Sequence, residues 1–261
     1  MIFLKTAEET EQLEKACDLV SRTLAEVARW IEPGVTTLKL DTVAKEFIMD
    51  NGGRPACLGY HGFPGTLCIE VNETVVHGFP SKYELKEGDI VGTDCVAELN
   101  GWCGDSCFTF EVGEVDPKVS RLLKVTRESL YKGIEAAKGG NRIGDISNAV
   151  QTYCERAGYN LVREMCGHGI GREMHEDPEV PNYGRRGIGP VLKPGMVICI
   201  EPMVNMGSKN IVIERDGWQC RTRDRKPSAH FEHEIAITEG DPRILTTFRY
   251  VDEVLAQKNG K

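Results

Sequence analysis

The sequence lacks any apolar run approaching the ~20 residues of a membrane span, which argues against a transmembrane role. Its N-terminus lacks the basic, apolar and small-residue regions of a secretory signal, so we expect a cytoplasmic protein. It has no dense run of lysine and arginine, and 40 acidic residues against 32 basic ones leave a net charge of −8. Because phosphate backbones are bound by clustered cations, we expect no specific nucleic-acid partner.

The chain also lacks a Cys-x-x-Cys pair, and the spacing of its ten cysteines shows no disulfide framework. A chain of 261 residues buries roughly 70 to 75 % of its unfolded surface, so its core needs no disulfide or structural metal. We therefore expect free thiols in a reducing compartment. The composition, 40 % apolar and 28 % charged, is that of an ordinary globular protein.

Two pairs of amphipathic helices are predicted, because apolar residues recur every three or four positions between capping and stop signals. The first helix begins at a capping box formed by Thr6 and Glu9, and the third begins at Pro117. The expected helix ends, in chain order, are Pro33-Gly34, Asn51-Gly52-Gly53, Gly139-Gly140 and Gly158.

The two helix pairs align at one constant offset of 106 residues. We infer an internal duplication within a single domain over residues 1–261, with halves of about 1–115 and 116–261. The matched positions are Gly34 with Gly140, Leu40 with Ile146, Phe47 with Tyr153, and Gly52 with Gly158.

Six further segments are rich in Val, Ile, Phe and Thr and are bounded by Gly or Pro, which is typical of strands. We predict an α+β fold in which the helix pairs pack on antiparallel sheet. The expected strands cover residues 66–76, 89–96, 103–112, 196–204, 210–214 and 230–238.

Two aspartates flank Asn100-Gly101, a strong signal for a two-residue hairpin turn. With that turn, facing residues sum to 201, so Asp94 faces Cys107 and Asp105 is its diagonal neighbour on the same face. Two carboxylates so close repel each other unless a divalent cation lies between them. Taken alone, the pair is also compatible with two solvated hairpin acids.

Three more residues favour the cation. His168 lies in a glycine-rich segment that lets the backbone approach a site closely, Glu201 ends an apolar strand, and Glu232 lies within another strand. A buried glutamate without a partner costs several kcal/mol. These acids, the imidazole and Asp105 satisfy one another most simply around two divalent cations.

Five segments carry a resemblance that spans nearly the whole chain, with order and spacing kept. They resemble the signature blocks of the type I methionine aminopeptidases, pita-bread enzymes of metallopeptidase family M24. The resemblance implies a fold of duplicated helix pairs on a curved antiparallel sheet. The segments are Val71 to Gly78, Asp94 with Gly104-Asp105-Ser106, Cys166 to Gly171, Ile200 to Met203, and Phe231 to His233.

The resemblance implies a metal-dependent hydrolase that removes the initiator methionine from nascent chains with a small second residue. A hydroxide shared by two metal ions would attack the scissile carbonyl, and Co, Mn, Fe or Zn would suit the site. Asp105 and Glu232 would bridge the ions. The complete implied ligand set is Asp94, Asp105, His168, Glu201 and Glu232.

The resemblance also assigns substrate contacts to His77 and His175, and a proton-shuttle role to Glu201 in addition to its role as a ligand. The pocket for the methionine side chain maps onto Cys57, Tyr60, His61, Phe63, Cys68 and Trp218. Thiols and aromatic rings suit an unbranched thioether. We expect His230 and His233 to pack or hydrogen-bond beside the site.

Three positions depart from the commoner family pattern: Gly92 replaces a frequent Asn, Cys103 a usual His, and Glu234 a usual Thr. We expect them to alter hydrogen bonds around the ligands, with Glu234 adding negative charge unless its strand points it away. The chain shows no N-terminal zinc-finger extension, and the family's short members suggest a monomer. A contact with the ribosome is left open.

Two alternatives remain. A prolidase or proline-specific aminopeptidase of the same fold would share the ligands, but those relatives usually carry an additional N-terminal domain. A non-catalytic binding member of the fold would typically have lost ligands. The sequence contains no His-Glu-x-x-His motif, no Gly-x-Gly-x-x-Gly and no recognisable cysteine or serine nucleophile.

Overall fold

The computed structural model describes residues 1–260, and its helices confirm both predicted pairs. Thr6 and Glu9 form the expected capping box at the start of the first helix. The fourth helix begins and ends 106 residues after the second, as the offset in the sequence requires. The helices are α1 (Ala7–Ala28), α2 (Thr37–Asp50), α3 (Pro117–Ala136), α4 (Ile143–Arg156) and α5 (Arg249–Asn259), with a 3-10 turn η1 (Tyr60–Gly62).

Helix α5 was not predicted from the sequence. It is short, and its buried face holds only Val251 and Val254 among large apolar residues, so the helical pattern is weak. It packs against α1 at the far end of the chain. Across the described residues, no helix is both long and apolar enough to span a membrane.

The strands form four small antiparallel sheets. The first joins β1 (Arg54–Pro55), β4 (Ile90–Leu99), β2 (Leu67–Val71) and β5 (Trp102–Glu111). The second joins β13 (Ser228–His230), β10 (Met203–Asn205) and β6 (Asn160–Leu161), and the third joins β11 (Ile211–Ile213), β12 (Cys220–Thr222) and β3 (Thr74–Val76). The fourth joins β15 (Arg243–Ile244), β14 (His233–Ala236), β9 (Val197–Ile200), β7 (Gly167–Gly169) and β8 (Glu176–Val180).

The predicted hairpin is confirmed in register. Asn100 and Gly101 form its turn with φ of 55° and 78°, the left-handed values that a tight two-residue turn requires. Asp94 faces Cys107, and Val96 faces Asp105. Both aspartates therefore project from the same face of the β4–β5 ribbon.

Three predicted strands are wrong in one respect, because each is interrupted. The segment 66–76 divides into β2 and β3 at Asn72, whose φ is 50°. The segments 196–204 and 230–238 divide at residues 201–202 and 231–232. Pro202 has no N–H to donate to a ladder, and the N–H of Glu232 donates instead to the Cys107 carbonyl oxygen of β5 at 3.0 Å.

The last two interruptions lie opposite each other. Ile200 pairs with His233 on one side of the gap, and Met203 pairs with His230 on the other. Glu201 and Glu232 are thus released from regular pairing at the same place, next to β5. The breaks in these two strands, which the sequence did not predict, bring both glutamates towards the aspartates of the hairpin.

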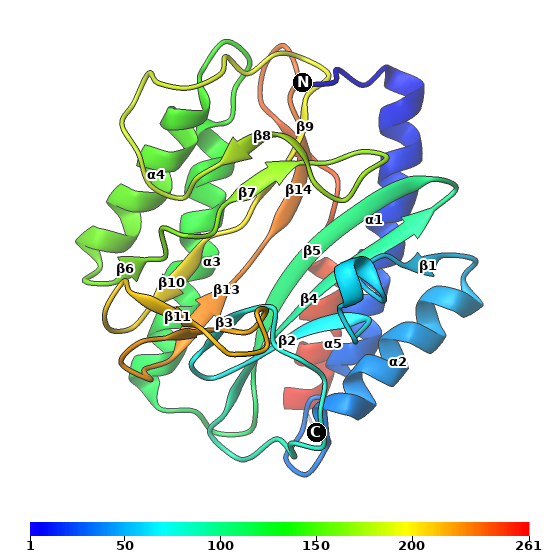
Figure 1. Cartoon of the computed structure of the whole chain (residues 1–261), viewed down its shortest axis with the longest axis vertical. Helices are drawn as coiled ribbons and strands as arrows, with labels where there is room; N and C mark the ends of the chain where they lie inside the picture. The colour runs from blue at the N-terminus through cyan, green and yellow to red at the C-terminus, as the bar shows by residue number, and fades with distance from the viewer. Residues whose placement is uncertain (261) are drawn as a thin grey trace.

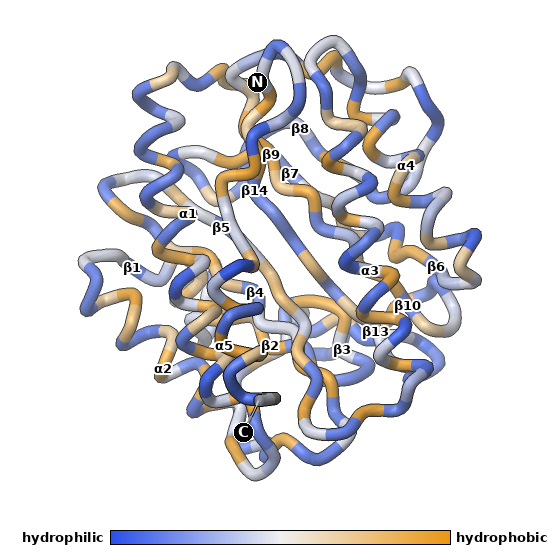
Figure 2. The backbone as a smooth tube through the Cα atoms, turned by 180° about the vertical axis from the view of Figure 1, so that it is seen from behind, coloured by the Kyte–Doolittle hydropathy of each residue, from blue (hydrophilic) through white to orange (hydrophobic). Residues whose placement is uncertain are grey.

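The helices cover one side of the strands. In Figure 1, α1, α3 and α5 lie behind the strands, and β4 and β5 curve across the front. Helix α1 packs on β4 and β5, while α3 packs on β9, β10 and β13. Figure 2 shows the alternation of hydrophobic and hydrophilic residues along these helices that such one-sided packing requires.

Gly104 marks the closest approach of the hairpin to α1. A Cβ at this position would lie 2.5 Å from the Ala16 carbonyl carbon and 2.6 Å from the Cys17 backbone nitrogen. Neither backbone atom can move without displacing the helix. Only glycine lets the strand that carries Asp105 pack this closely against α1.

We therefore expect Gly104→Ala to lower the free energy of unfolding by about 1 to 3 kcal/mol through overpacking. Urea denaturation of the metal-free protein measures the change. Gly240→Ala is the matched control, because a Cβ there meets nothing within 4 Å. Equal stabilities of the two variants would contradict the close packing of the hairpin on α1.

Candidate metal centre

All five residues of the predicted ligand set line one cavity of about 710 Å³. They come from both halves of the chain, on separate strands or at strand ends. The elements are β4 for Asp94, β5 for Asp105, β7 for His168, the end of β9 for Glu201, and the break between β13 and β14 for Glu232.

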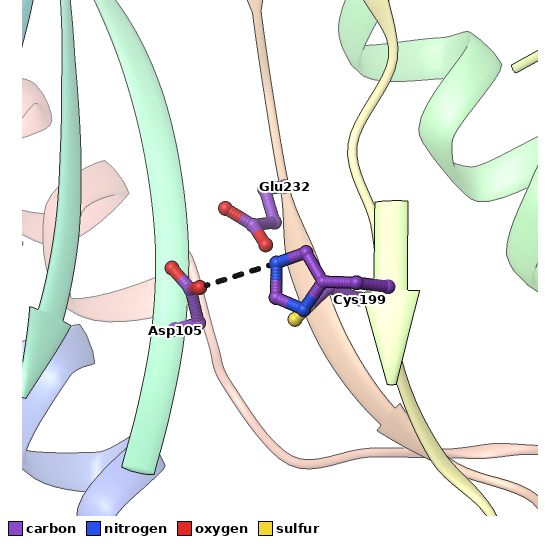
Figure 3. A group of neighbouring side chains, drawn as sticks. Asp105, Cys199 and Glu232 are labelled. Atoms are coloured by element: carbon purple, nitrogen blue, oxygen red, sulfur yellow. Dashed lines mark ion pairs between the residues drawn. The ribbon is translucent and has the colours of Figure 1, made fainter. Parts of the chain in front are cut away.

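The side chains lie close enough to share ions. His168 Nε2 lies 3.7 Å from Asp105 Oδ2 and 3.5 Å from Glu201 Oε1. One potential ligand atom each from Asp105, His168, Cys199 and Glu232 falls within 4.8 Å of the others. Figure 3 shows Asp105 and Glu232 facing each other across this group, and its dashed line marks the contact of Asp105 with the imidazole.

Several carboxylate oxygens in this group have no hydrogen-bond partner among the described residues. They are buried atoms of three residues: Asp94 Oδ1, Asp105 Oδ1 and Glu232 Oε1. An unpaired buried carboxylate oxygen is costly, and a cation satisfies several such oxygens at once. The donor set of carboxylates and one imidazole therefore fits divalent metal ions.

Burial dominates the acid–base behaviour of these carboxyl groups. It raises the pKa of Asp105, Glu201 and Glu232 well above their usual range, and neighbouring carboxylates raise each further. The charge of Asp94 contributes to the raised pKa of all three. Mutual repulsion in a dry site disfavours the charged forms unless positive charge is present.

The hydrogen bonding of His168 leaves one ring nitrogen, Nε2, free to bind a metal ion. Its Nδ1 lies 2.9 Å from the Gly169 carbonyl oxygen, so Nδ1 carries the hydrogen and Nε2 has a free lone pair towards the carboxylates. Burial, followed by the charge of His175, lowers the pKa of His168 to about 3. The ring is therefore neutral near pH 7, as a metal-ligating imidazole must be.

The two predicted substrate histidines line the same cavity. His77 follows β3 with φ of 58°, a backbone conformation uncommon for a non-glycine residue, and its ring lies edge-on to Trp218 at 6.0 Å. The ring of His175 lies 4.5 Å from that of His168. Burial lowers the pKa of both His77 and His175, which favours neutral rings.

Most residues of the predicted methionine pocket line the same cavity as the ligand set. Phe63 lies edge-on to Trp218 at 5.2 Å. His61 is the exception, because it is exposed in η1 with φ of 45°, lies against Tyr60 and does not line the cavity. The predicted pocket residues that do line the cavity are Cys57, Tyr60, Phe63, Cys68 and Trp218.

Sequence reasoning missed Met174 and Cys199. Met174 lines the cavity, with its Sδ 3.9 Å from the Cys57 Sγ. Cys199 contributes its thiol to the group around Asp105, although burial raises its pKa well above the usual range and favours the protonated form. Alternation along the apolar run that ends at Ile200 was the available signal, since it places Cys199 on the face opposite Ile198 and Ile200.

Two of the three departures from the family pattern lie near Asp105. Glu234 is fully buried, and its Oε2 accepts a hydrogen bond of 3.1 Å from the Asp105 backbone N–H. Burial raises the pKa of Glu234 to about 8. The buried thiol of Cys103 donates to the Arg172 carbonyl oxygen at 3.7 Å, in the loop that follows β7.

The other two histidines of the site region are hydrogen-bonded, as expected. His233 Nδ1 pairs with Thr246 Oγ1 at 2.7 Å and its Nε2 with the Tyr131 hydroxyl at 3.2 Å. His230 Nδ1 lies 3.1 Å from Glu70 Oε1. Burial alone would lower the pKa of His230, but the Glu70 carboxylate outweighs it and the pKa is raised.

The chain matches known proteins in sequence and in structure. The model of metallopeptidase family M24 matches residues 11–239. The chain is 49 % identical over 249 residues to a methionine aminopeptidase of Clostridium perfringens, a match that covers 95 % of this chain and all of the relative.

All ten cysteines are free, as predicted.

Solved structures confirm the pita-bread fold. The methionine aminopeptidase of Thermotoga maritima superposes with a TM-score of 0.93 at 45 % identity, covering 95 % of this chain and all of that one. A prolidase of Pyrococcus horikoshii, at 23 % identity and a TM-score of 0.76, shares the fold over 94 % of this chain and 63 % of its own. The chain therefore belongs to metallopeptidase family M24 and, within it, to the methionine aminopeptidases.

Proposed function

We propose that this metal-dependent aminopeptidase removes the N-terminal methionine of nascent chains with two divalent cations, held by Asp94, Asp105, His168, Glu201 and Glu232. One observation carries the proposal. Three of these residues bury carboxylate oxygens that have no hydrogen-bond partner in the part of the chain that the structure describes. By resemblance to the family, Asp105 and Glu232 would be the ligands shared by the two ions.

Cations bound there supply Lewis acidity, which polarises a carbonyl and acidifies water. The chain's own carboxylates prepare the site by concentrating negative charge in a water-poor cavity. Glu201 accepts the proton that the attacking water loses and passes it to the departing amine. Its buried carboxyl group suits this task, because burial and then the neighbouring carboxylates raise its pKa and make it a stronger proton acceptor than an exposed glutamate.

His77 and His175 orient the scissile peptide. Both rings line the cavity, and their lowered pKa values favour neutral imidazoles, which can donate a hydrogen bond without adding charge. Such donors stabilise the oxyanion that develops as the carbonyl is attacked.

The methionine side chain occupies the sulfur- and ring-lined end of the cavity. Cys57 and Met174 place two sulfur atoms 3.9 Å apart, and Phe63 and Trp218 supply ring edges. Sulfur and aromatic contacts are favourable for a thioether. The lining therefore accepts an unbranched apolar side chain.

The metal is proposed to be Co, Mn, Fe or Zn, because carboxylate-rich sites with one imidazole accept each of them. A cytoplasmic location, a monomeric state and a contact with the ribosome stay predictions of the sequence. A tolerance for only small second residues also stays a prediction.

The proposed function is tested by release of free methionine from two peptides. Chelator-stripped protein is given Met-Ala-Ser or Met-Leu-Ser, with and without added Mn²⁺ or Co²⁺. We expect metal-dependent release from the first peptide and little from the second. No release from either peptide, despite bound metal, would contradict the assignment of the substrate.

Asp105→Asn and Glu232→Gln test the proposed bridging ligands. Each change removes an anionic ligand but keeps the size of the side chain, so we expect turnover to fall to the metal-free level while circular dichroism stays unchanged. Asp241→Asn is the control, because the Asp241 side chain is exposed, forms an ion pair with Lys138 and does not line the cavity. Full activity of either site variant, with trace metal controlled, would refute the dinuclear assignment.

The pH dependence of stability tests the burial of the carboxyl groups. In the metal-free protein the pKa of Glu70 is about 7 and that of Glu234 about 8, both raised by burial from 4.5. At about pH 7.5 the His168 ring, whose ordinary pKa is 6.5, is almost entirely neutral in the folded and the unfolded chain. Glu70 and Glu234 then make the folded chain bind more protons than the unfolded one, so the free energy of unfolding falls as pH rises from about 7.5 to about 9.

Urea denaturation at the two ends of this pH range measures the effect. Added Mn²⁺ should reduce the fall in stability, since cations favour the deprotonated carboxylates. A metal-free protein that becomes more stable towards the alkaline end would contradict the raised pKa values.

A further inference from the structure

Glu70 and His230 form a buried ion pair directly behind the proposed metal ligand Glu201, and the mechanism above uses neither residue. His230 Nδ1 lies 3.1 Å from Glu70 Oε1 and 3.2 Å from Oε2. The two side chains are each only 3 % exposed. A pair this deeply buried is costly to assemble and is weak evidence for stability alone.

The other edge of the imidazole faces Glu201. His230 Nε2 lies 3.7 Å from Glu201 Oε2, and it has no hydrogen-bond partner among the described residues. The second oxygen of Glu201, Oε1, faces His168 Nε2 at 3.5 Å. Each oxygen of Glu201 is thus directed at a different imidazole, and only one of them points into the ligand group around Asp105.

The backbone of His230 is hydrogen-bonded to β5. The His230 N–H donates to Thr109 Oγ1 at 3.0 Å, and the Thr109 hydroxyl donates back to the His230 carbonyl oxygen at 2.6 Å. The Cys107 thiol, also on β5, lies 3.9 Å from Glu70 Oε2 of β2. The pair is therefore anchored to β5, the strand that also carries Asp105.

Gly92 provides the space for the pair. Gly92 faces Glu70 across the β2–β4 ladder, and a Cβ at this position would overlap with Glu70 Oε2 and lie 3.1 Å from the Glu70 Cβ. An asparagine, the frequent residue of the family at this position, would displace the Glu70 carboxylate. The departure at Gly92 thus has a physical reason in the presence of Glu70.

We propose that Glu70 and His230 are positioning residues for Glu201, an inference that rests on the proposed role of Glu201 as a metal ligand. Glu70 holds the ring by Nδ1, and Nε2 then faces one oxygen of Glu201 at 3.7 Å. Glu201 thereby keeps its other oxygen, Oε1, directed at His168 and the ligand group.

Co²⁺ binding to the chelator-stripped protein tests this role without relying on turnover. Isothermal titration calorimetry gives the affinity of His230→Leu, Glu70→Leu and the double variant, and the visible absorption of the Co²⁺ complex reports its coordination. We expect each single change to weaken Co²⁺ binding by about 10- to 100-fold, as removal of a residue that orients a ligand does. The double variant should bind no more weakly than His230→Leu, because Glu70 acts only through His230.

Asp41→Asn is the matched control for general loss of stability. Asp41 is a buried carboxylate that accepts the backbone N–H groups of Thr66 and Leu67 and does not line the cavity. Its change should lower the melting temperature but leave the Co²⁺ affinity and the absorption bands as in the wild type. Equal loss of Co²⁺ affinity in Asp41→Asn would overturn a specific role for the pair.

The double variant keeps the test decisive if a single variant fails to fold, because it leaves no unpaired charge in the core. Wild-type affinity and absorption in the double variant would overturn the positioning role. Failure of the wild-type protein itself to bind Co²⁺ would instead refute the proposed metal centre, so the two failures are distinguishable.

Discussion

The concentration of buried carboxyl groups on one side of the strands is the constraint on which the rest of the structure depends. Asp94, Asp105, Glu201 and Glu232 line one cavity, and burial together with mutual repulsion raises the pKa of the last three. No arrangement of the surrounding chain removes that repulsion without added positive charge. The fold tolerates it by spreading the acids over different strands and strand ends, which belong to more than one sheet. A site that is unfavourable when empty is well suited to hold cations tightly.

The interruptions of the strands are as important as the strands themselves. Regular pairing through residues 201–202 and 231–232 would have directed alternate side chains to the two faces of the sheet, and the glutamates would have been held by the ladder. The opposed gaps free them, and the hydrogen bond from the Glu232 N–H to the Cys107 carbonyl oxygen turns that segment towards the hairpin. The backbone of β5 thus serves both as the support of Asp105 and as the partner of the segment that carries Glu232.

Residues that are not in the ligand set contact the ligands and support them. Glu234 accepts the backbone N–H of Asp105, and the Glu70–His230 pair lies against Glu201. Gly92 and Glu234, which looked like isolated departures from the family pattern, belong to these two supports. These two departures therefore lie in the packing and hydrogen bonding around the ligands, where they can alter metal affinity without changing the ligands themselves.

The sequence by itself determined the helix pairs, the hairpin register and the ligand candidates, because each depends on local signals. Capping residues and glycines mark the ends of α1 to α4, and Asn100-Gly101 sets which residue faces Asp94. Tertiary structure decided the strand breaks beside Glu201 and Glu232, the outward position of His61, the inclusion of Met174 in the cavity, and the pairing of Glu70 with His230. Those features depend on contacts between residues up to 160 positions apart in the chain, and no local pattern of hydrophobicity or turn residues encodes such contacts.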